Sequence, residues 1–301
     1  MIVILTALDV EYAAVAAHLV NPRKQQHNRG TIFNVGTLGT NSEQEIATAW
    51  LGMGNVTAGI LTERAVEMFQ PSALLFTGVA GGMRDWLSLG DVVVASHVYA
   101  YHGGKSEDTE FLSRPRSWDI SHRIDQAAKH LAHDGVWRRS LPPDSRQPEV
   151  HFGPLVAGEA VLNSRRSPLA EHLRRNYNDA IAAEMESSGF SLAGHLNDVP
   201  VATVRAISDA AGGDKERTDA EGWQLVAARN AAAFTVSLAA ELSDRTGRPA
   251  GATADADSPE GSAEPKPTSG PVLRDNAQAA QVSTIHHGSS HFGAGFFGGR
   301  S

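Results

Sequence analysis

The sequence predicts an α/β protein, with a single three-layer domain whose central sheet is mixed, mostly parallel and twisted, and is flanked by helices. Short runs rich in Val, Ile and Leu alternate with segments of helical periodicity, and glycine turns separate them. The chain has 301 residues, of which 41% are hydrophobic. That composition suits one globular domain of about 240 residues plus a further segment.

The first half of the chain supplies the first strands. A strand is expected over residues 2–8, and a helix over residues 9–19, whose acidic first turn suits the helix dipole. Strands are expected over residues 32–35 and 46–51. The remaining elements are a helix over residues 56–69, a strand over 73–77 ending in a glycine-rich turn at 78–82, and a strand over 92–95.

The second half begins with a polar loop over residues 102–118 and a helix over 120–131. The later elements are a strand over residues 150–159, a short helix over 170–176, a helix near 186–193, a strand over 199–209 and an Ala-rich helix over 220–242. The strand over 199–209 is rich in apolar and β-branched residues, and it carries Arg205 and Asp209 toward its carboxyl end. Because open α/β sheets place their chemistry at the carboxyl ends of strands, we expect a site there.

Composition excludes several classes of function. The net charge is -8, so no global basic field favours nucleic acid. The sequence has no cysteine, which excludes a disulfide framework and a thiolate zinc site. We find no run of about 18 apolar residues that would cross a membrane. The apolar N-terminus fits a first strand better than a signal peptide, so we expect a soluble, cytoplasmic protein without metal or cofactor.

The composition changes after residue 243. Residues 244–280 are rich in Pro, Gly, Ala, Ser and Asp, which predicts a disordered linker that separates the domain at 1–243 from the C-terminus. Residues 281–301 form a short Gly/Phe-rich terminal motif. Two interpretations stay open for it: a disordered tail, or a cross-β segment for amyloid-like signalling and self-assembly.

Five segments occur in an order typical of one family. They are residues 7–11 (ALDVE), 52–56 (GMGNV), 77–82 (TGVAGG) with 89–91 (LGD), 183–187 (AEMES) and 204–209 (VRAISD). Together they resemble the nucleoside phosphorylase superfamily, and within it the 5'-methylthioadenosine/S-adenosylhomocysteine nucleosidases. The resemblance covers residues 1 to about 243 and implies a phosphorylase-like fold that cleaves the N-glycosidic bond of a purine nucleoside.

The resemblance also implies a role for each matching residue. Asp209 matches the general acid that protonates the leaving purine, and Ser208 orients its carboxyl. Glu11 and Arg205 match the pair that handles the attacking water, with Glu11 as the base. Glu186 matches the residue that binds the ribose hydroxyls. The other substrate-binding positions are Met185, Gly81, Val79, Met53, Val161, Leu162 and Trp223.

Three positions depart from the family pattern. Phosphorylases of the superfamily carry an Arg and a Ser where this chain has Phe76 and Val79. Neither residue can hold a phosphate oxygen, so hydrolysis is favoured over phosphorolysis. Val79 also replaces the Ser with which nucleosidases hold the water. Val161 replaces an aromatic residue that stacks on the purine.

Two alternatives to a nucleosidase of methylthioadenosine or S-adenosylhomocysteine stay open. In the first, Lys105, Arg114 and Arg116, with Arg165 and Arg166, receive phosphates on the ribose 5' position. The chain would then be an adenine nucleotide (ATP) nucleosidase acting as an immune effector. In the second, the departures from the family mark a non-catalytic, nucleoside-sensing signalling protein. The resemblance further implies a homodimer in which neighbouring subunits complete the pocket.

Overall fold

The computed structural model describes residues 1–39, 45–143, 146–213 and 215–246. All of them belong to one compact unit. The expected linker and terminal motif, except for residues 244–246 at the end of the last helix, lie outside the described residues.

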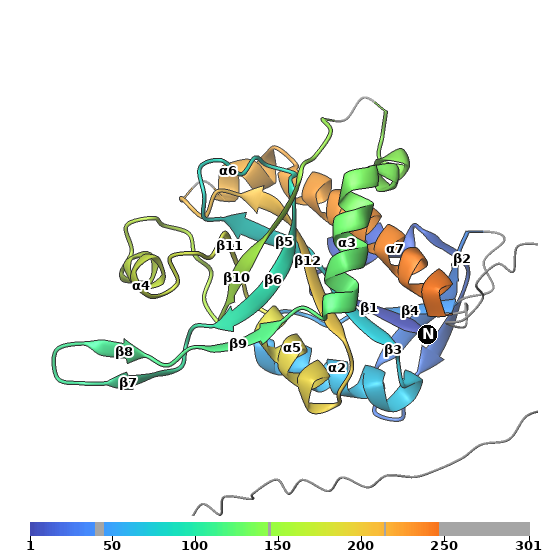
Figure 1. Cartoon of the computed structure of the whole chain (residues 1–301), viewed down its shortest axis with the longest axis horizontal. Helices are drawn as coiled ribbons and strands as arrows, with labels where there is room; N and C mark the ends of the chain where they lie inside the picture. The colour runs from blue at the N-terminus through green and yellow to red at the C-terminus, as the bar shows by residue number, and fades with distance from the viewer. Residues whose placement is uncertain (40–44, 144–145, 214, 247–301) are drawn as a thin grey trace, which may run out of the picture. The chain divides into compact units, whose positions relative to one another are not determined.

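A mixed sheet forms the centre of the domain (Figure 1). Its strand order is β11 (Ala182–Glu184), β10 (Val150–Ala157), β6 (Val92–Ala100), β12 (Val201–Asp209), β5 (Ala73–Gly82), β1 (Ile2–Thr6), β4 (Glu45–Trp50), β3 (Ile32–Leu38) and β2 (Leu19–Gln26). Parallel pairing joins β4, β1, β5 and β12, and again β6, β10 and β11. Strand β11 also pairs with the end of β5, so the sheet curls back on itself there. The prediction of a mixed sheet is confirmed.

Helices cover both faces of the sheet (Figure 1). They are α1 (Asp9–Ala16), α2 (Asn55–Phe69), α3 (His122–Asp134), α4 (Pro168–Asn176), α5 (Ser187–Leu196), α6 (Lys215–Ala220) and α7 (Trp223–Thr246), with a 3-10 turn η1 (Val136–Ser140). Successive side chains of a strand point to opposite faces. In β1, Ile2 and Ile4 therefore pack with α1, α3 and α7, whereas Val3 and Leu5 pack with α2 and α5. This alternation gives the predicted three layers.

Helix α7 corrects the expectation that no segment is long and apolar enough to cross a membrane. Among the described residues, its stretch Trp223–Ser243 is long and apolar enough to cross a membrane by length and composition alone. Two thirds of the qualifying window is buried inside the domain, where Ala231, Phe234 and Leu238 pack against the sheet. The apolar character of α7 is therefore that of a core helix.

Several element boundaries differ from the predictions. Helix α1 ends at Ala16, and the unpredicted strand β2 follows; β2 is a largely exposed edge strand whose polar sequence hides its β structure. The polar loop contains the hairpin strands β7 (Gly104–Ser106) and β8 (Phe111–Ser113), and then β9 (Arg116–Asp119), which pairs with β6. The glycine-rich segment at 78–82 is not a turn, because β5 continues through it.

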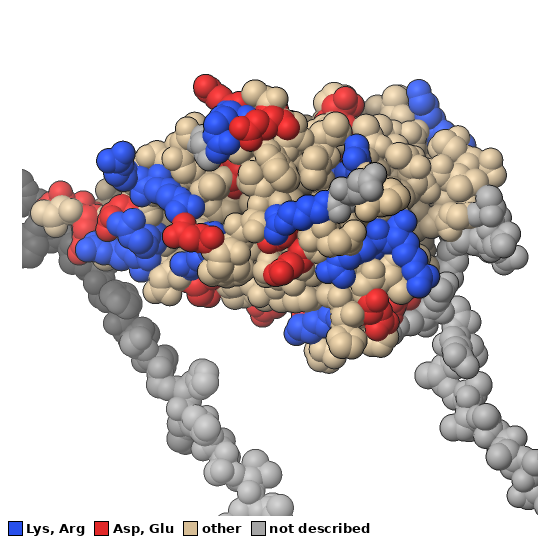
Figure 2. All heavy atoms as spheres, turned by 90° about the horizontal axis from the view of Figure 1, so that it is seen from above, with Lys and Arg blue, Asp and Glu red and all other residues tan. Residues whose placement is uncertain are grey.

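The surface carries both signs of charge. Figure 2 shows Lys and Arg side chains interspersed with Asp and Glu over the face seen from above. No field of a single sign covers this face, in agreement with the composition.

Candidate active site

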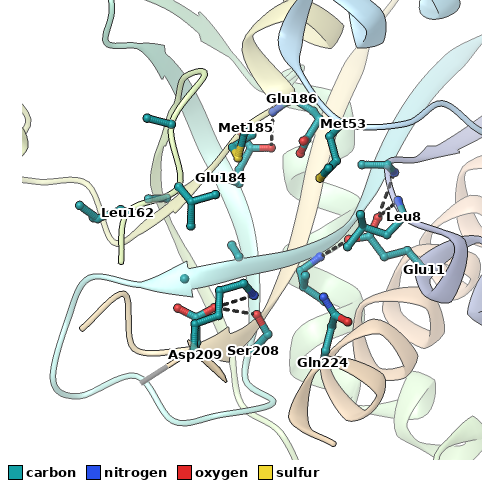
Figure 3. Close-up of a pocket in the computed structure, with 18 residues that line it drawn as sticks. Leu8, Glu11, Met53, Leu162, Glu184, Met185, Glu186, Ser208, Asp209 and Gln224 are labelled. Atoms are coloured by element: carbon teal, nitrogen blue, oxygen red, sulfur yellow. Dashed lines mark hydrogen bonds and ion pairs between the residues drawn. The ribbon is translucent and has the colours of Figure 1, made fainter. Parts of the chain in front are cut away.

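A cavity of about 200 Å³ lies at the carboxyl ends of β1, β5, β11 and β12. This is the edge at which parallel sheets usually present their functional groups. The described residues that line it are Ala7, Leu8, Glu11, Met53, Val79, Ala80, Gly81, Ala160, Val161, Leu162, Ala183, Glu184, Met185, Glu186, Ser208, Asp209, Lys215 and Gln224. Figure 3 shows the acidic side chains around this space, with the thioethers of Met53 and Met185 beside it.

Glu11 is a buried carboxylate in the first turn of α1. Its Oε2 accepts hydrogen bonds from the backbone N–H groups of Ala7 and Leu8, both at 2.9 Å, and its Oε1 accepts one from Val79 at 2.8 Å. Burial raises the pKa of Glu11, while the charge of Arg205 and these backbone bonds act in the opposite direction. A carboxylate offers about four acceptor sites, so the three bonds leave one for a further proton donor.

Arg205 lies behind the wall of the cavity, fully enclosed on β12. Its Nη2 donates to Glu184 Oε2 and, at 3.0 Å, to Ser187 Oγ. Its Cζ lies 4.3 Å from the centre of the Phe76 ring. Its Nε and Nη1 have no hydrogen-bond partner among the described residues. Only a glycine fits at Gly78, since a Cβ there would overlap both the Glu11 carboxyl and Arg205 Nη1.

Glu186 is the N-cap residue of α5 and is also buried. Its Oε1 accepts a hydrogen bond of 3.2 Å from the backbone of Gly54, and its Oε2 lies 3.7 Å from Arg205 Nη2. Burial, together with the nearby negative charge of Glu184, raises the pKa of Glu186 to about 7. Glu186 therefore titrates close to neutral pH.

Asp209 ends β12 at the opposite side of the cavity from Glu186 (Figure 3). Its Oδ1 accepts a hydrogen bond of 2.8 Å from the backbone of Ala211, and its Oδ2 accepts one of 3.1 Å from Ser208 Oγ. Lys215 Nζ lies 3.6 Å from Oδ2. A Cβ at Gly81 would be 3.0 Å from Oδ1, so the glycine lets β5 approach the carboxyl.

The structure brings most of the predicted site residues to this one cavity. The exceptions are Arg205, which sits behind it, and Trp223, whose ring lies near Gly90 while its neighbour Gln224 lines the cavity. The cations at Lys105, Arg114, Arg116, Arg165 and Arg166 do not line it. Sequence reasoning assigned no role to Glu184, Lys215 or Gln224. Glu184 lies within the AEMES motif, which could have indicated it, whereas no motif marks the other two.

Comparisons with known proteins agree with this architecture. The family model described as "Phosphorylase superfamily" matches residues 1–240. The chain is 25% identical over 239 residues to a 5'-methylthioadenosine/S-adenosylhomocysteine nucleosidase of Maridesulfovibrio salexigens, covering 79% of this chain and 98% of that protein. It is 27% identical over 247 residues to ATP nucleosidase Cap17 of Escherichia coli, covering 73% of this chain but 47% of that protein.

A solved structure shows the same fold. The 5'-methylthioadenosine/S-adenosylhomocysteine nucleosidase of Colwellia psychrerythraea, in complex with adenine, superposes with a TM-score of 0.69 at 23% identity, over 80% of this chain and 95% of that one. The resemblance inferred from five sequence segments is thereby confirmed. The chain belongs to the phosphorylase superfamily.

Proposed function

We propose that this protein hydrolyses the N-glycosidic bond of an adenine nucleoside, such as methylthioadenosine or S-adenosylhomocysteine, and releases adenine. One observation carries the proposal: Glu11, Glu186 and Asp209, from three distant parts of the chain, line a single cavity. Such an arrangement provides a base, a ribose-binding anion and an acid for one reaction. The nucleosidase relatives described above support the same chemistry.

In the proposed reaction, the residues at the two ends of the cavity have different roles. The bond between the anomeric carbon and the purine nitrogen breaks, and its electron pair leaves with the base. Asp209 supplies a proton to the purine, which makes it a better leaving group. Glu186 accepts hydrogen bonds from the ribose hydroxyls, and its anion favours the positive charge that develops on the sugar. Water then bonds to the anomeric carbon and gives a proton to Glu11.

The surroundings of Glu11 favour water over phosphate. After its three backbone hydrogen bonds, Glu11 keeps one acceptor site, which a water molecule in the cavity can use. A phosphate would need accessible cations, but Arg205 is fully enclosed and paired with Glu184, and the side chains of Phe76 and Val79 offer no polar group. Lys215, the one cation among the described lining residues, lies beside Asp209 instead.

An adenine release assay tests the proposal. Purified protein is offered a panel of adenine nucleosides and nucleotides, with and without phosphate, and the sugar product is identified. We expect free adenine and an unphosphorylated sugar. A phosphorylated sugar would contradict the hydrolytic step, and the absence of adenine from every substrate would contradict the function. Binding without turnover would favour the nucleoside-sensing alternative.

An ATP nucleosidase is the second candidate function, and the likeness to Cap17 favours it. Of the cations expected to receive the phosphates, Lys105, Arg114 and Arg116 lie on or beside the β7–β8 hairpin and β9, and none of the three lines the cavity of the same chain. Arg165 lines a neighbouring cavity instead. ATP in the same panel distinguishes this candidate.

A homodimer contact is the proposed partner interaction of this domain. The outer face of α2 and α5 exposes Val56, Ile60 and Leu196 at 72%, 53% and 73%. These side chains border a hollow of about 720 Å³ together with Trp118. Exposed apolar side chains gathered in this way mark protein contacts. Because Met53 of the active site immediately precedes α2, a second copy seated here would lie next to the substrate.

We place the proposed hydrolysis in the cytoplasm, in purine salvage.

A further inference from the structure

A second cavity, of about 260 Å³, gathers three arginines on an otherwise acidic protein. Arg84, Arg165 and Arg174 line it, and none of its described lining residues is acidic. A guanidinium offers five donors in a rigid fork that matches the geometry of phosphate and carboxylate oxygens. Three of them around one hollow form a site with anion chemistry.

The present partners of these arginines leave most of their donors available. Arg84 Nη2 donates to the backbone carbonyl of Asn178. Arg165 Nη1 and Arg174 Nη2 pair with Asp85 and Glu171, whose side chains are 87% and 61% exposed. Such exposed pairs are worth little, so an anion that contacts all three guanidiniums competes with them easily.

This cavity adjoins the end of the active site that holds Asp209. Leu162 lines both cavities. Arg165 donates Nε and Nη2 to the carbonyl of Ala210, at 3.4 and 3.3 Å. The N–H of the same peptide unit, that of Ala211, donates to Asp209 Oδ1 at 2.8 Å. A single peptide plane therefore links Arg165 to the carboxyl proposed as the acid, and a donor on its carbonyl strengthens its N–H.

The backbone at this link is held in an unfavourable conformation. Ala211 has a φ of 47°, in the left-handed region that non-glycine residues rarely adopt. Such a turn persists only when its surroundings fix it. The bonds from Arg165 on one side and to Asp209 on the other provide this restraint.

We propose that the arginine cavity binds a phosphate group, and that Arg165 is a positioning residue that transmits occupancy of the cavity to Asp209. The binding stands on the three guanidiniums alone. The coupling rests on the proposed acid role of Asp209, so the two parts are tested by separate measurements.

Calorimetric titration of the full chain with inorganic pyrophosphate tests the binding. We expect measurable affinity, weakened about tenfold or more by Arg84→Gln or Arg174→Gln, since each removes charge-assisted hydrogen bonds. Arg139→Gln, an exposed arginine on η1, is the matched control and should leave the affinity unchanged. No binding, or an equal loss in the control, would overturn the proposal.

The same titration identifies the source of the phosphate. The protein is first saturated with adenine, and pyrophosphate and adenosine monophosphate are then compared. Stronger binding of the monophosphate would support a phosphate ester as ligand, and binding of pyrophosphate alone would support a free anion. In both cases Arg84→Gln must weaken the binding about tenfold or more; undiminished binding would place the anion elsewhere and contradict the site.

Kinetics of adenine release test the coupling. We expect Arg165→Gln to lower kcat about tenfold with KM unchanged, Arg165→Lys to restore part of it, and Arg84→Gln to keep the kcat of the original protein in the absence of anions. Saturating pyrophosphate should change kcat at least twofold in the original protein and not in Arg84→Gln. An unchanged kcat in Arg165→Gln, or a raised KM instead, would refute the coupling. If no adenine is released while pyrophosphate binds, the proposed function fails and the anion site stands.

Discussion

Arg205 forms an enclosed ion pair with Glu184, which lines the active-site cavity, and their side-chain exposures are 0% and 2%. Glu184 also accepts hydrogen bonds from the backbone N–H groups of Glu186 and Ser187 and from Ser187 Oγ. The pair therefore fixes both the guanidinium near Glu11 and the start of α5, which carries Glu186. It supports both ends of the proposed sugar site.

Replacing Glu184 by Gln should destabilise the protein and shift the titration of Glu186. Breaking a buried pair costs about 3–5 kcal/mol, and we expect the lower end because Glu11 and Glu186 still neutralise Arg205. Loss of the negative charge should lower the pKa of Glu186. Denaturant unfolding measures the first effect, and the pH dependence of KM the second. An unchanged KM profile would show that the Glu184 charge does not act on Glu186.

Substitution of Asp209 by Asn should abolish most of the activity. The amide keeps the shape of the side chain but cannot deliver a proton, so kcat should fall about 100-fold or more. Its oxygen can still accept from Ala211, so the unfolding midpoint should stay close to that of the original protein. Ser208→Ala serves as the milder companion, because it removes one bond and no proton. Full turnover by the Asn variant would exclude Asp209 as the acid.

Nucleoside affinity should depend on pH through Glu186. Ionised Glu186 accepts hydrogen bonds from the ribose hydroxyls more strongly than the neutral acid, so KM should fall as pH rises through about 7. The folded pKa lies above the ordinary value of 4.5, so the stability gained from protonating this group is complete below that value and is lost as pH rises to about 7. Glu186→Gln should bind weakly with a flat profile. A KM profile of the original protein without this step would contradict the assignment.

Val79→Ser should raise activity. The backbone N–H of Val79 is already bonded to Glu11, and its side chain gives a water molecule nothing to bond. A hydroxyl at this half-buried position would add one hydrogen bond to the attacking water, worth about threefold to tenfold in kcat. Val79→Thr, which keeps the β-branch, controls for the change in shape. A fall in kcat for both variants would show that the water lies elsewhere.

Charge on the outer face of α2 should separate the subunits. Ile60→Arg would place a guanidinium in the proposed contact, and we expect sedimentation velocity to show monomers in place of dimers. Ile32→Arg on β3, where the original side chain is 52% exposed, is the matched control. A dimer that survives Ile60→Arg would require another contact surface.

The sequence was most informative where local chemistry determines structure. The β-branched run before Asp209 and the acidic first turn of α1 predicted both elements, and Asp209 and Glu11 line the candidate cavity. It failed at β2, whose polar residues form an edge strand only because β3 lies beside them. The pairing of Arg205 with Glu184 was equally hidden, since 21 residues separate them and only the sheet brings them together. Gln224, not the predicted Trp223, lines the cavity, because packing determines which face of α7 points toward the site.

Strand β12 lies between β5 and β6, which precede it by more than a hundred residues. When only the first 200 residues have left the ribosome, the edges of β5 and β6 that β12 will later join are therefore still unpaired. The centre of the sheet and the active site are completed by the same late segment, 201–209. A nascent chain truncated before this segment has neither a closed core nor Asp209, the proposed acid, so we expect an incomplete copy to be inactive.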